Sequence, residues 1–320
     1  MVKIYQNIPG MECQNNNRIN SKFWNEGKWD NFVVPHLPED CTDQTFVEMG
    51  CNAGLFLMLA EDTGFRHVVG VDKDKTPVLE GLKYRDSIGY KYKIIKSTLG
   101  GQFGNPGNFN IDKLPVADFT LMSTFHYYID INSWIKYVDR LRNKTRCVLI
   151  ISRHTRQDHW RALSDLKPVR RYFRDWEELG MISGISKDGD PSPRDLWSVL
   201  FKNPVLERIN IDEVKTHKEN STDEMYIAVE DLATLVRDND DIDPFETEYY
   251  RAWVKRKQGR WSSKRIKTFV KSKFDLMVSI KSNGLLEPLM IQQDNKLSDG
   301  GHRLAILKAL GYKSVLVRRI

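Results

Sequence analysis

The stretch that decides the fold is Phe46-Val47-Glu48-Met49-Gly50-Cys51-Asn52-Ala53-Gly54, where a short apolar run ends on an acid and enters a glycine turn. The pattern predicts a β-strand at its start and a helix directly after it, over 55–61. Gly50 and Gly54 permit the tight turn and leave no Cβ between the backbone and a ligand. The unpaired N–H groups at the start of the helix then offer hydrogen bonds to a carboxylate or a phosphate.

A second acid follows at the end of the next expected strand, over 68–71. Asp72 lies 22 residues after Gly50. A carboxylate in this position can accept hydrogen bonds from both hydroxyls of a ribose, as it does in dinucleotide sites. The glycine turn and the acid together are far more specific than either feature alone.

Outward from this motif, apolar runs alternate with amphipathic stretches. Further strands and helices are expected at 77–84, 92–96, 119–124, 131–141 and 147–152. Such alternation predicts an α/β fold with a doubly wound, mostly parallel sheet covered by helices on both faces. We also expect a helix at 174–180 and a closing antiparallel pair of strands at 205–214 and 225–229.

The length of 320 residues and the 40% hydrophobic content predict a folded protein of two domains. We place the first at 1–230, with a polar lead-in at 1–44, and a smaller α+β domain at 231–320, since an acidic run at 238–241 precedes a very basic segment. No apolar run approaches the ~20 residues that span a bilayer, and no signal peptide is recognisable. A cytoplasmic protein without a membrane span is therefore expected. Its oligomeric state stays open.

The four cysteines form no Cys-x-x-Cys pair, which predicts neither a disulfide framework nor a zinc site. We therefore expect no metal site formed by the cysteines. The net charge of +6 mildly favours an anionic ligand or partner.

The first motif resembles that of class I S-adenosylmethionine-dependent methyltransferases, which has an acid, any residue, a glycine, and a second glycine four residues later. Glu48, Gly50 and Gly54 match this pattern. The resemblance covers roughly residues 20–230. It implies a Rossmann-like methyltransferase fold, with S-adenosyl-L-methionine as cofactor. A nicotinamide or nucleotide fold without methyl transfer is the alternative, but a dinucleotide fingerprint requires glycine where Asn52 stands.

The same resemblance implies where the cofactor lies. Its methionine part would contact residues 48–54, its ribose would contact Asp72, and its adenine would lie near the ends of the third and fourth strands. The third-strand segment Ser97-Thr98-Leu99 lacks the acid that is often found there. The cofactor-binding residues are then Glu48, Gly50, Asn52, Gly54, Asp72, Thr98, Ser123 and Phe125.

The loop after the fourth strand is expected to face the reacting methyl group, because ligands of such folds bind outside the carboxyl ends of the strands. His126 in this loop is a candidate base for a hydroxyl acceptor, and His154 after the fifth strand is a second one. A packing role for His126 is the alternative. No Asn-Pro-Pro-Tyr or Asp-Pro-Pro-Tyr sequence is present here, which argues against the usual amino-methylating DNA enzymes. The His-containing stretch resembles that of small-molecule and sugar O-methyltransferases, which implies O-methylation of a small-molecule, sugar (glycan) or phosphate acceptor.

A second motif lies near the C-terminus, where Gly284-Leu-Leu-Glu-Pro288-Leu precedes Asp299-Gly300-Gly301-His302-Arg303-Leu-Ala. The pattern predicts a helix ending at Gly284, a strand at 289–292, a helix at 304–310 and a strand at 315–317. Backbone amides at the second helix start, with His302 and Arg303, would form an anion-sized pocket. A plain tight turn is the alternative.

This segment resembles the ParB and sulfiredoxin superfamily over 277–317. The resemblance implies a nucleotide-binding module for ATP or CTP with Mg²⁺, and some members transfer phosphate to a small hydroxyl compound. A kinase activity beside the methyltransferase is thus one hypothesis. The residues implied are Gly284, Pro288, Asp299, Gly300, Gly301, His302 and Arg303.

The basic segment 255–273 supports an alternative function, a nucleic-acid-binding protein that methylates DNA or RNA. Its cations would contact phosphates, and Trp253 and Trp261 would stack on bases.

Overall fold

The computed structural model describes residues 8, 26–99, 109–123, 129, 131–153, 166–185, 196–216, 224–238 and 242–320. Its contacts separate two compact units, Met1–Pro204 and Val205–Ile320. The sequence-based boundary at 231 therefore differs from that of the structure. The reason is strand β8 (Leu206–Asn210), which pairs with the last strand of the chain, β11 (Ser314–Arg319), and not with the first sheet.

The first unit contains a seven-stranded sheet in the order β3-β2-β1-β4-β5-β7-β6. Its strands are β1 (Thr45–Met49), β2 (His67–Asp72), β3 (Lys93–Lys96), β4 (Ala117–Ser123), β5 (Thr145–Arg153), β6 (Glu177–Ile185) and β7 (Leu196–Lys202). The first five strands are parallel, and β7 runs antiparallel between β5 and β6. The predicted doubly wound, mostly parallel α/β sheet is confirmed.

Two sequence-based predictions about the end of this sheet are wrong. The expected helix at 174–180 is largely the start of β6, and the antiparallel pair is β6 with β7 rather than 205–214 with 225–229. Residues 225–229 belong to helix α6 (Glu224–Asp238). Periodicity misled here because Glu177, Glu178 and the exposed Leu179 lie on an edge strand, where apolar and polar positions need not alternate.

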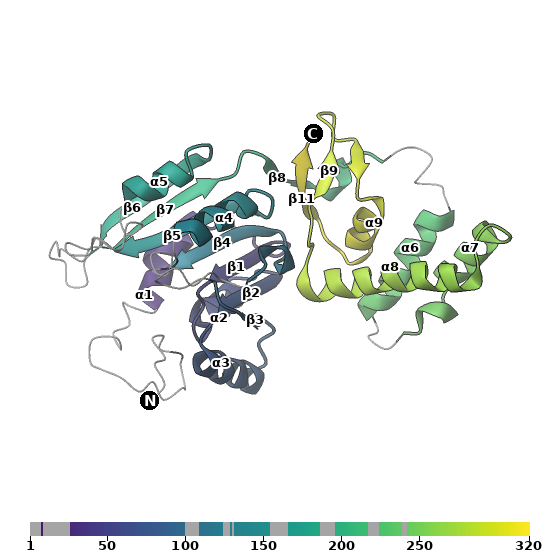
Figure 1. The fold of residues 1–320 in the computed structure, drawn as a ribbon, viewed down its shortest axis with the longest axis horizontal. Helices are drawn as coiled ribbons and strands as arrows, with labels where there is room; N and C mark the ends of the chain where they lie inside the picture. The colour runs from purple at the N-terminus through teal and green to yellow at the C-terminus, as the bar shows by residue number, and fades with distance from the viewer. Residues whose placement is uncertain are drawn as a thin grey trace. The chain divides into compact units, whose positions relative to one another are not determined.

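Helices cover both faces of the first sheet. They are α2 (Leu55–Asp62), α3 (Lys75–Ile88), α4 (Ile131–Leu141) and α5 (Leu166–Tyr172), preceded by the short helical turns α1 (Glu26–Lys28), η2 (Trp29–Val33) and η3 (Val34–His36). Figure 1 shows α4 and α5 on one side of the strands and α2 and α3 on the other. Successive residues of β1 separate the two cores, since Phe46 packs with Trp29 and Val47 belongs to the cluster of Trp134.

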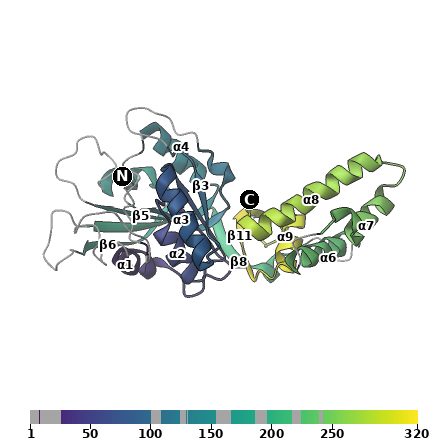
Figure 2. The same ribbon diagram turned by 90° about the horizontal axis from the view of Figure 1, so that it is seen from below.

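The second unit has a four-stranded sheet, β10-β9-β11-β8, of which only β9 and β11 are parallel to each other. Its other elements are η6 (Ile211–Glu213), α6, η7 (Pro244–Glu246), α7 (Glu248–Lys257), α8 (Ser263–Asn283), β9 (Leu289–Ile291), β10 (Leu297–Asp299) and α9 (Gly301–Ala309). Figure 2 shows α7 beside the first half of α8. The expected C-terminal helices and strands are confirmed. Among the described residues, no helix has both the length and the hydropathy that crossing a bilayer requires.

The pairing of β8 with β11 makes a prediction about fragments. A fragment of residues 205–320 should fold cooperatively, because it retains every strand of the second sheet. A fragment of 231–320 lacks β8 and the first part of α6, which leaves one side of β11 unpaired. Urea unfolding followed by circular dichroism should show a cooperative transition for the first fragment. An equally stable shorter fragment would contradict this boundary.

Candidate functional site

The strand order of the first sheet reverses between β1 and β4, and ligands of open α/β sheets bind at such a point, outside the carboxyl ends of the strands. Glu48 is the penultimate residue of β1, and Leu121 of β4 lies opposite it. Ser123 ends β4, and Asp72 ends β2. The fold thus brings these predicted residues to one edge of the sheet.

The loop after β1 is held in its turn by the end of β2. The backbone N–H groups of Gly50 and Cys51 both donate to the carbonyl of Val71, with N···O distances of 2.8 and 3.1 Å. Gly50, Asn52 and Gly54 all have positive φ angles, 84°, 50° and 91°. Such angles favour glycine, and asparagine tolerates them better than most other residues. The sequence of the loop therefore matches its backbone residue by residue.

Asp72 contacts this loop directly. Its Oδ2 accepts the N–H of Asn52 at 2.7 Å, and its Oδ1 accepts the N–H of Asp74 at 2.9 Å. Each carboxylate oxygen has a second lone pair, so the group can still accept a pair of hydroxyls. The carbonyl of Asp72 also accepts the N–H of Ser97, which brings the predicted Thr98 next to this corner. The glycine turn and the acid thus face the same place.

Glu48 is the unusual group of the site. It is 1% exposed, and its Oε2 has no hydrogen-bond partner among the described residues. Burial raises the pKa of Glu48 well above 4.5, the Asp72 carboxylate raises it further, and Lys28 opposes this shift. The pKa of Asp72 is also raised, mainly by burial. Two acids in a desolvated corner are best stabilised by a positively charged ligand.

A second orphaned atom lies in the same loop. Asn52 Oδ1 is buried without a hydrogen-bond partner in the described part of the chain. Buried polar groups normally have partners, and exceptions concentrate where a ligand or water completes the site. Both atoms are acceptors, or can be, which fits a ligand that carries hydrogen-bond donors.

Two residues that shape the loop were not predicted as part of the site. Gly81 of α3 approaches it so closely that an added Cβ would lie 2.1 Å from the carbonyl oxygen of Ala53. An added Cβ at Gly54 would lie 3.2 Å from the ring of Tyr92. A glycine inside an expected helix was the available signal for Gly81. No local pattern marked Tyr92.

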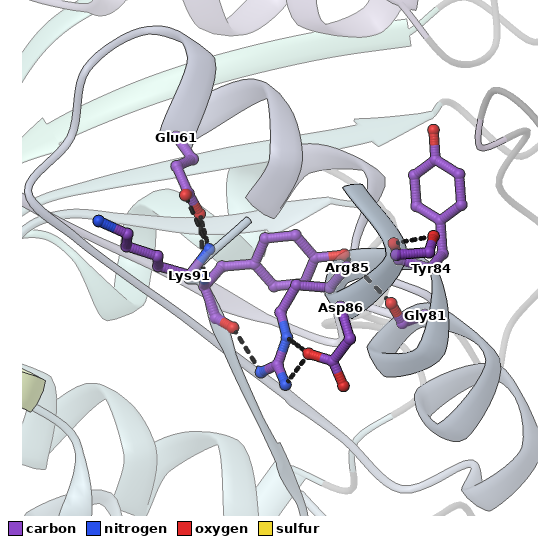
Figure 3. Close-up of polar contacts among 8 residues, drawn as sticks. Glu61, Gly81, Tyr84, Arg85, Asp86 and Lys91 are labelled. Carbon is purple, nitrogen blue, oxygen red and sulfur yellow. Dashed lines mark hydrogen bonds and ion pairs between the residues drawn. The ribbon is translucent and has the colours of Figure 1, made fainter. Parts of the chain in front are cut away.

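Tyr92 is fixed from both flanking helices. Glu61 of α2 accepts the backbone N–H groups of Lys91 and Tyr92, each at 2.8 Å, and Arg85 of α3 donates to the Tyr92 carbonyl at 2.9 Å. The Tyr92 hydroxyl donates to the carbonyl of Gly81 at 3.3 Å. Figure 3 shows these polar contacts around Glu61, Gly81 and Arg85. The wall behind Gly54 is thus a rigid, hydrogen-bonded one.

The other residues predicted for this site lie outside the described residues. They are Phe125 and the two candidate bases, His126 and His154. The catalytic roles of these histidines therefore remain predictions from the sequence.

The residues of the second motif also come together. Arg303 donates to the carbonyl oxygens of Glu287 (3.2 Å) and Pro288 (3.1 Å) and to Asp299 Oδ2 (2.7 Å). It thereby ties the turn after Gly284, which ends α8 with φ 79°, to the start of α9. The arginine thus contacts these three protein oxygens, and its predicted role as a phosphate ligand stays a prediction.

The helix start in this motif is open. Gly300 has φ 105°, and an added Cβ there would lie 2.6 Å from Leu289, whereas a Cβ at Gly301 would meet no atom closer than 4.0 Å. Burial and Lys273 lower the pKa of His302 to about 4, so its ring is neutral at pH 7. With His302 neutral, the positive charge near this helix start comes from the N–H groups that begin α9 and from the neighbouring cations Arg303 and Lys273.

Comparisons with known proteins give the following findings. No protein-family profile and no curated protein matches the sequence. The PH0226 protein from Pyrococcus horikoshii OT3 has a TM-score of 0.45 and 12% identity, over 58% of this chain and 93% of its own. A SAM-dependent methyltransferase from Aquifex aeolicus has a TM-score of 0.40 and 16% identity, over 55% of this chain and 93% of its own. The N-methyltransferase NodS from Bradyrhizobium japonicum, in complex with S-adenosyl-L-homocysteine, has a TM-score of 0.39 and 14% identity, over 50% of this chain and 78% of its own.

The raised pKa of Glu48 predicts a pH-dependent gain in stability for Glu48→Gln. The folded protein holds the Glu48 proton more tightly than the unfolded chain, so the free energy of unfolding falls as pH rises above about 4.5. Each unit of pKa elevation costs about 1.4 kcal/mol above the folded pKa. The Glu48→Gln variant should therefore unfold at a higher temperature than the parent at pH 8, and the difference should shrink toward pH 4.5.

Thermal unfolding between these pH values measures the effect. Glu39→Gln, which makes the same change at an exposed acid, is the matched control. A Glu48→Gln variant that is less stable than the parent throughout would mean that a cation, such as Lys28, already stabilises the ionised carboxylate.

Proposed function

We propose that the first unit is an S-adenosyl-L-methionine-dependent methyltransferase. One observation carries the proposal: Asp72 and the loop 50–54 meet through the 2.7 Å hydrogen bond between Asp72 Oδ2 and the N–H of Asn52. This contact lies beside the point where the strand order reverses, between β1 and β4. The acid-and-glycine pattern of this loop resembles the first motif of this enzyme class, and the loop lies where ligands of open α/β sheets bind.

The chemistry of the corner fits this cofactor. S-adenosylmethionine is cationic at its sulfonium and ammonium groups, and Glu48 with Asp72 supplies two acids whose ionisation burial opposes. The ribose hydroxyls would donate to the free lone pairs of Asp72, and the open backbone at Gly50 and Gly54 would accept the methionine part. When bound, the cofactor supplies an activated methyl group for displacement at carbon. The protein's part is to hold donor and acceptor in line and to exclude water.

The acceptor is proposed from the sequence. His126, or His154, would remove a proton from a hydroxyl of a small molecule, a sugar or a phosphate compound. DNA or RNA is the alternative acceptor, which the basic segment 255–273 favours.

Asp72→Asn tests the cofactor site. The amide keeps an oxygen for the Asn52 N–H, so the loop should hold its shape, but it offers one acceptor oxygen where the carboxylate offered two. We expect S-adenosylhomocysteine to bind about tenfold or more weakly in calorimetry, as expected for the loss of a charged hydrogen bond. Asp139→Asn, at an exposed acid of α4, should bind like the parent. Unchanged affinity in Asp72→Asn would exclude this ribose site.

We further propose that the second unit binds ATP or CTP at the start of α9. The support is the joining of the 284–288 turn to this helix start by Arg303, and the open space at Gly301. Phosphates would be held by the N–H groups of Gly301 and His302, with Mg²⁺ on the outer oxygens. Transfer of phosphate to a hydroxyl compound is the further step that the resemblance suggests.

Gly301→Asp should reduce nucleotide affinity at least tenfold, because it places a carboxylate where the phosphate would lie. Gly301→Asn is the matched control, since it has the same shape without the charge and should bind more tightly than Gly301→Asp. Calorimetry with ATP or CTP in the presence of Mg²⁺ measures both. Equal binding by the two variants, or none by the parent, would refute the site.

A further inference from the structure

The charge of the second unit is concentrated in one segment. Between Arg251 and Lys273 the chain has ten lysines and arginines and no aspartate or glutamate, whereas the net charge of all 320 residues is only +6. The rest of the chain is therefore net negative. The segment spans residues 251–257 of α7, the turn at Gly259 and the first half of α8, and the two helices lie side by side in Figure 2. We call this segment, residues 251–273, the basic hairpin.

An aromatic cluster locks the two arms of the basic hairpin together. Trp253 of α7 stacks on Trp261, with ring centroids 5.7 Å apart and an interplanar angle of 13°, and it contacts Phe269 of α8 at 4.4 Å. Trp253 is only 8% exposed. Aromatic pairs of this kind add to stability beyond the area that they bury. The two helices therefore form a stiff support for the charged side chains on their outer surface.

The cluster also changes the expected role of the tryptophans. Lys257 and Arg265 lie over the Trp261 ring, 5.0 and 4.4 Å from its centroid, and Trp253 covers it by stacking. The prediction that Trp253 and Trp261 stack on bases is therefore not supported by this geometry, because protein groups already contact their faces. What the hairpin offers outward is positive charge rather than aromatic surface.

In the part of the chain that the structure describes, several cations of the basic hairpin have no nearby acid or helix dipole that would stabilise their charge. Lys264 and Arg265 lie in the first turn of α8, which holds no acid, although the positive end of a helix dipole disfavours cations. Arg260 and Lys264 are exposed, and neither has a carboxylate partner among the described residues. By contrast, Lys271 pairs with Asp275 at 2.9 Å. Repulsion of this kind is relieved by an anionic partner.

The surface favours a nucleic acid over a membrane. In the described segment 251–273, Val254 alone is an exposed large apolar side chain (38% exposed), so the hairpin has little to insert among lipid chains. Duplex nucleic acid carries one negative charge per about 1.7 Å of helix axis, which suits closely spaced cations on a rigid support.

We propose that the basic hairpin binds the phosphate backbone of double-stranded nucleic acid without reading its bases. This inference is independent of the methyl-donor site. Where nucleic acid is the methyl acceptor, the hairpin holds the substrate; where it is not, the hairpin localises the enzyme on the duplex.

The test uses the full chain, without methyl donor, and a fluorescently labelled DNA duplex of mixed sequence. Anisotropy titrations from about 50 to about 200 mM salt should show affinity that falls steeply with salt and little difference between sequences. The double variant Arg260→Gln/Lys264→Gln should lose two phosphate contacts. Its salt slope should be smaller by about 2, and its affinity about tenfold lower.

Lys113→Gln/Lys136→Gln is the matched control, because it removes the same charge from exposed lysines of the first unit and should keep the parent's slope. Equal effects of the two double variants would overturn the proposal, since net charge alone would then explain binding. Absence of duplex binding at low salt would overturn it too. So would binding only to vesicles of equal parts phosphatidylcholine and phosphatidylserine. An RNA duplex that binds with the same slope supports backbone recognition.

Discussion

The hydrogen bond between the Asn52 N–H and Asp72 Oδ2 joins the two segments on which the site depends, the loop after β1 and the end of β2. The loop can make this contact only because three of its residues have positive φ angles, which a chain of ordinary residues would resist. Around it, Gly81 lets α3 approach the carbonyl of Ala53, and Tyr92 fills the space behind Gly54. The first unit is thus built to keep one short turn in one conformation.

The conformation of this turn buries two acids, which is unfavourable for their charged forms and indicates that the corner binds a cation. Glu48 and Asp72 are held in a corner where burial raises the pKa of both, and the Asp72 carboxylate raises the pKa of Glu48 further. A protein selected for stability alone would replace a buried, partly unsatisfied acid by an apolar residue. Retaining it is reasonable where a cationic ligand supplies the missing partner. The basic hairpin of the second unit shows the same logic with the opposite sign, since its clustered cations are best relieved by an anion.

Much of this arrangement could be predicted from the sequence, and the misses have physical causes. The loop and Asp72 were predictable because the backbone restricts which residues can stand at Gly50 and Gly54, so spacing alone identifies them. The β6 strand was mistaken for a helix because an edge strand with exposed Leu179 has no clear alternation. The place of β8 was missed because strand partners 108 residues apart, such as Arg208 and Leu316, leave no local signal. Arg303 contacts oxygens of its own domain, which no local pattern indicated, and its predicted contact with phosphate stays a prediction.

The central claim is that the turn at 50–54 and the carboxylate of Asp72 hold one ligand, the methyl donor, between them. A crystal structure of the protein with S-adenosylhomocysteine tests this most directly. Both ribose hydroxyls should lie within hydrogen-bond distance of the Asp72 carboxylate, and the amino-acid part of the ligand should lie against the backbone of Gly50 and Gly54. A ligand bound elsewhere, with the turn and Asp72 facing only solvent, would contradict it.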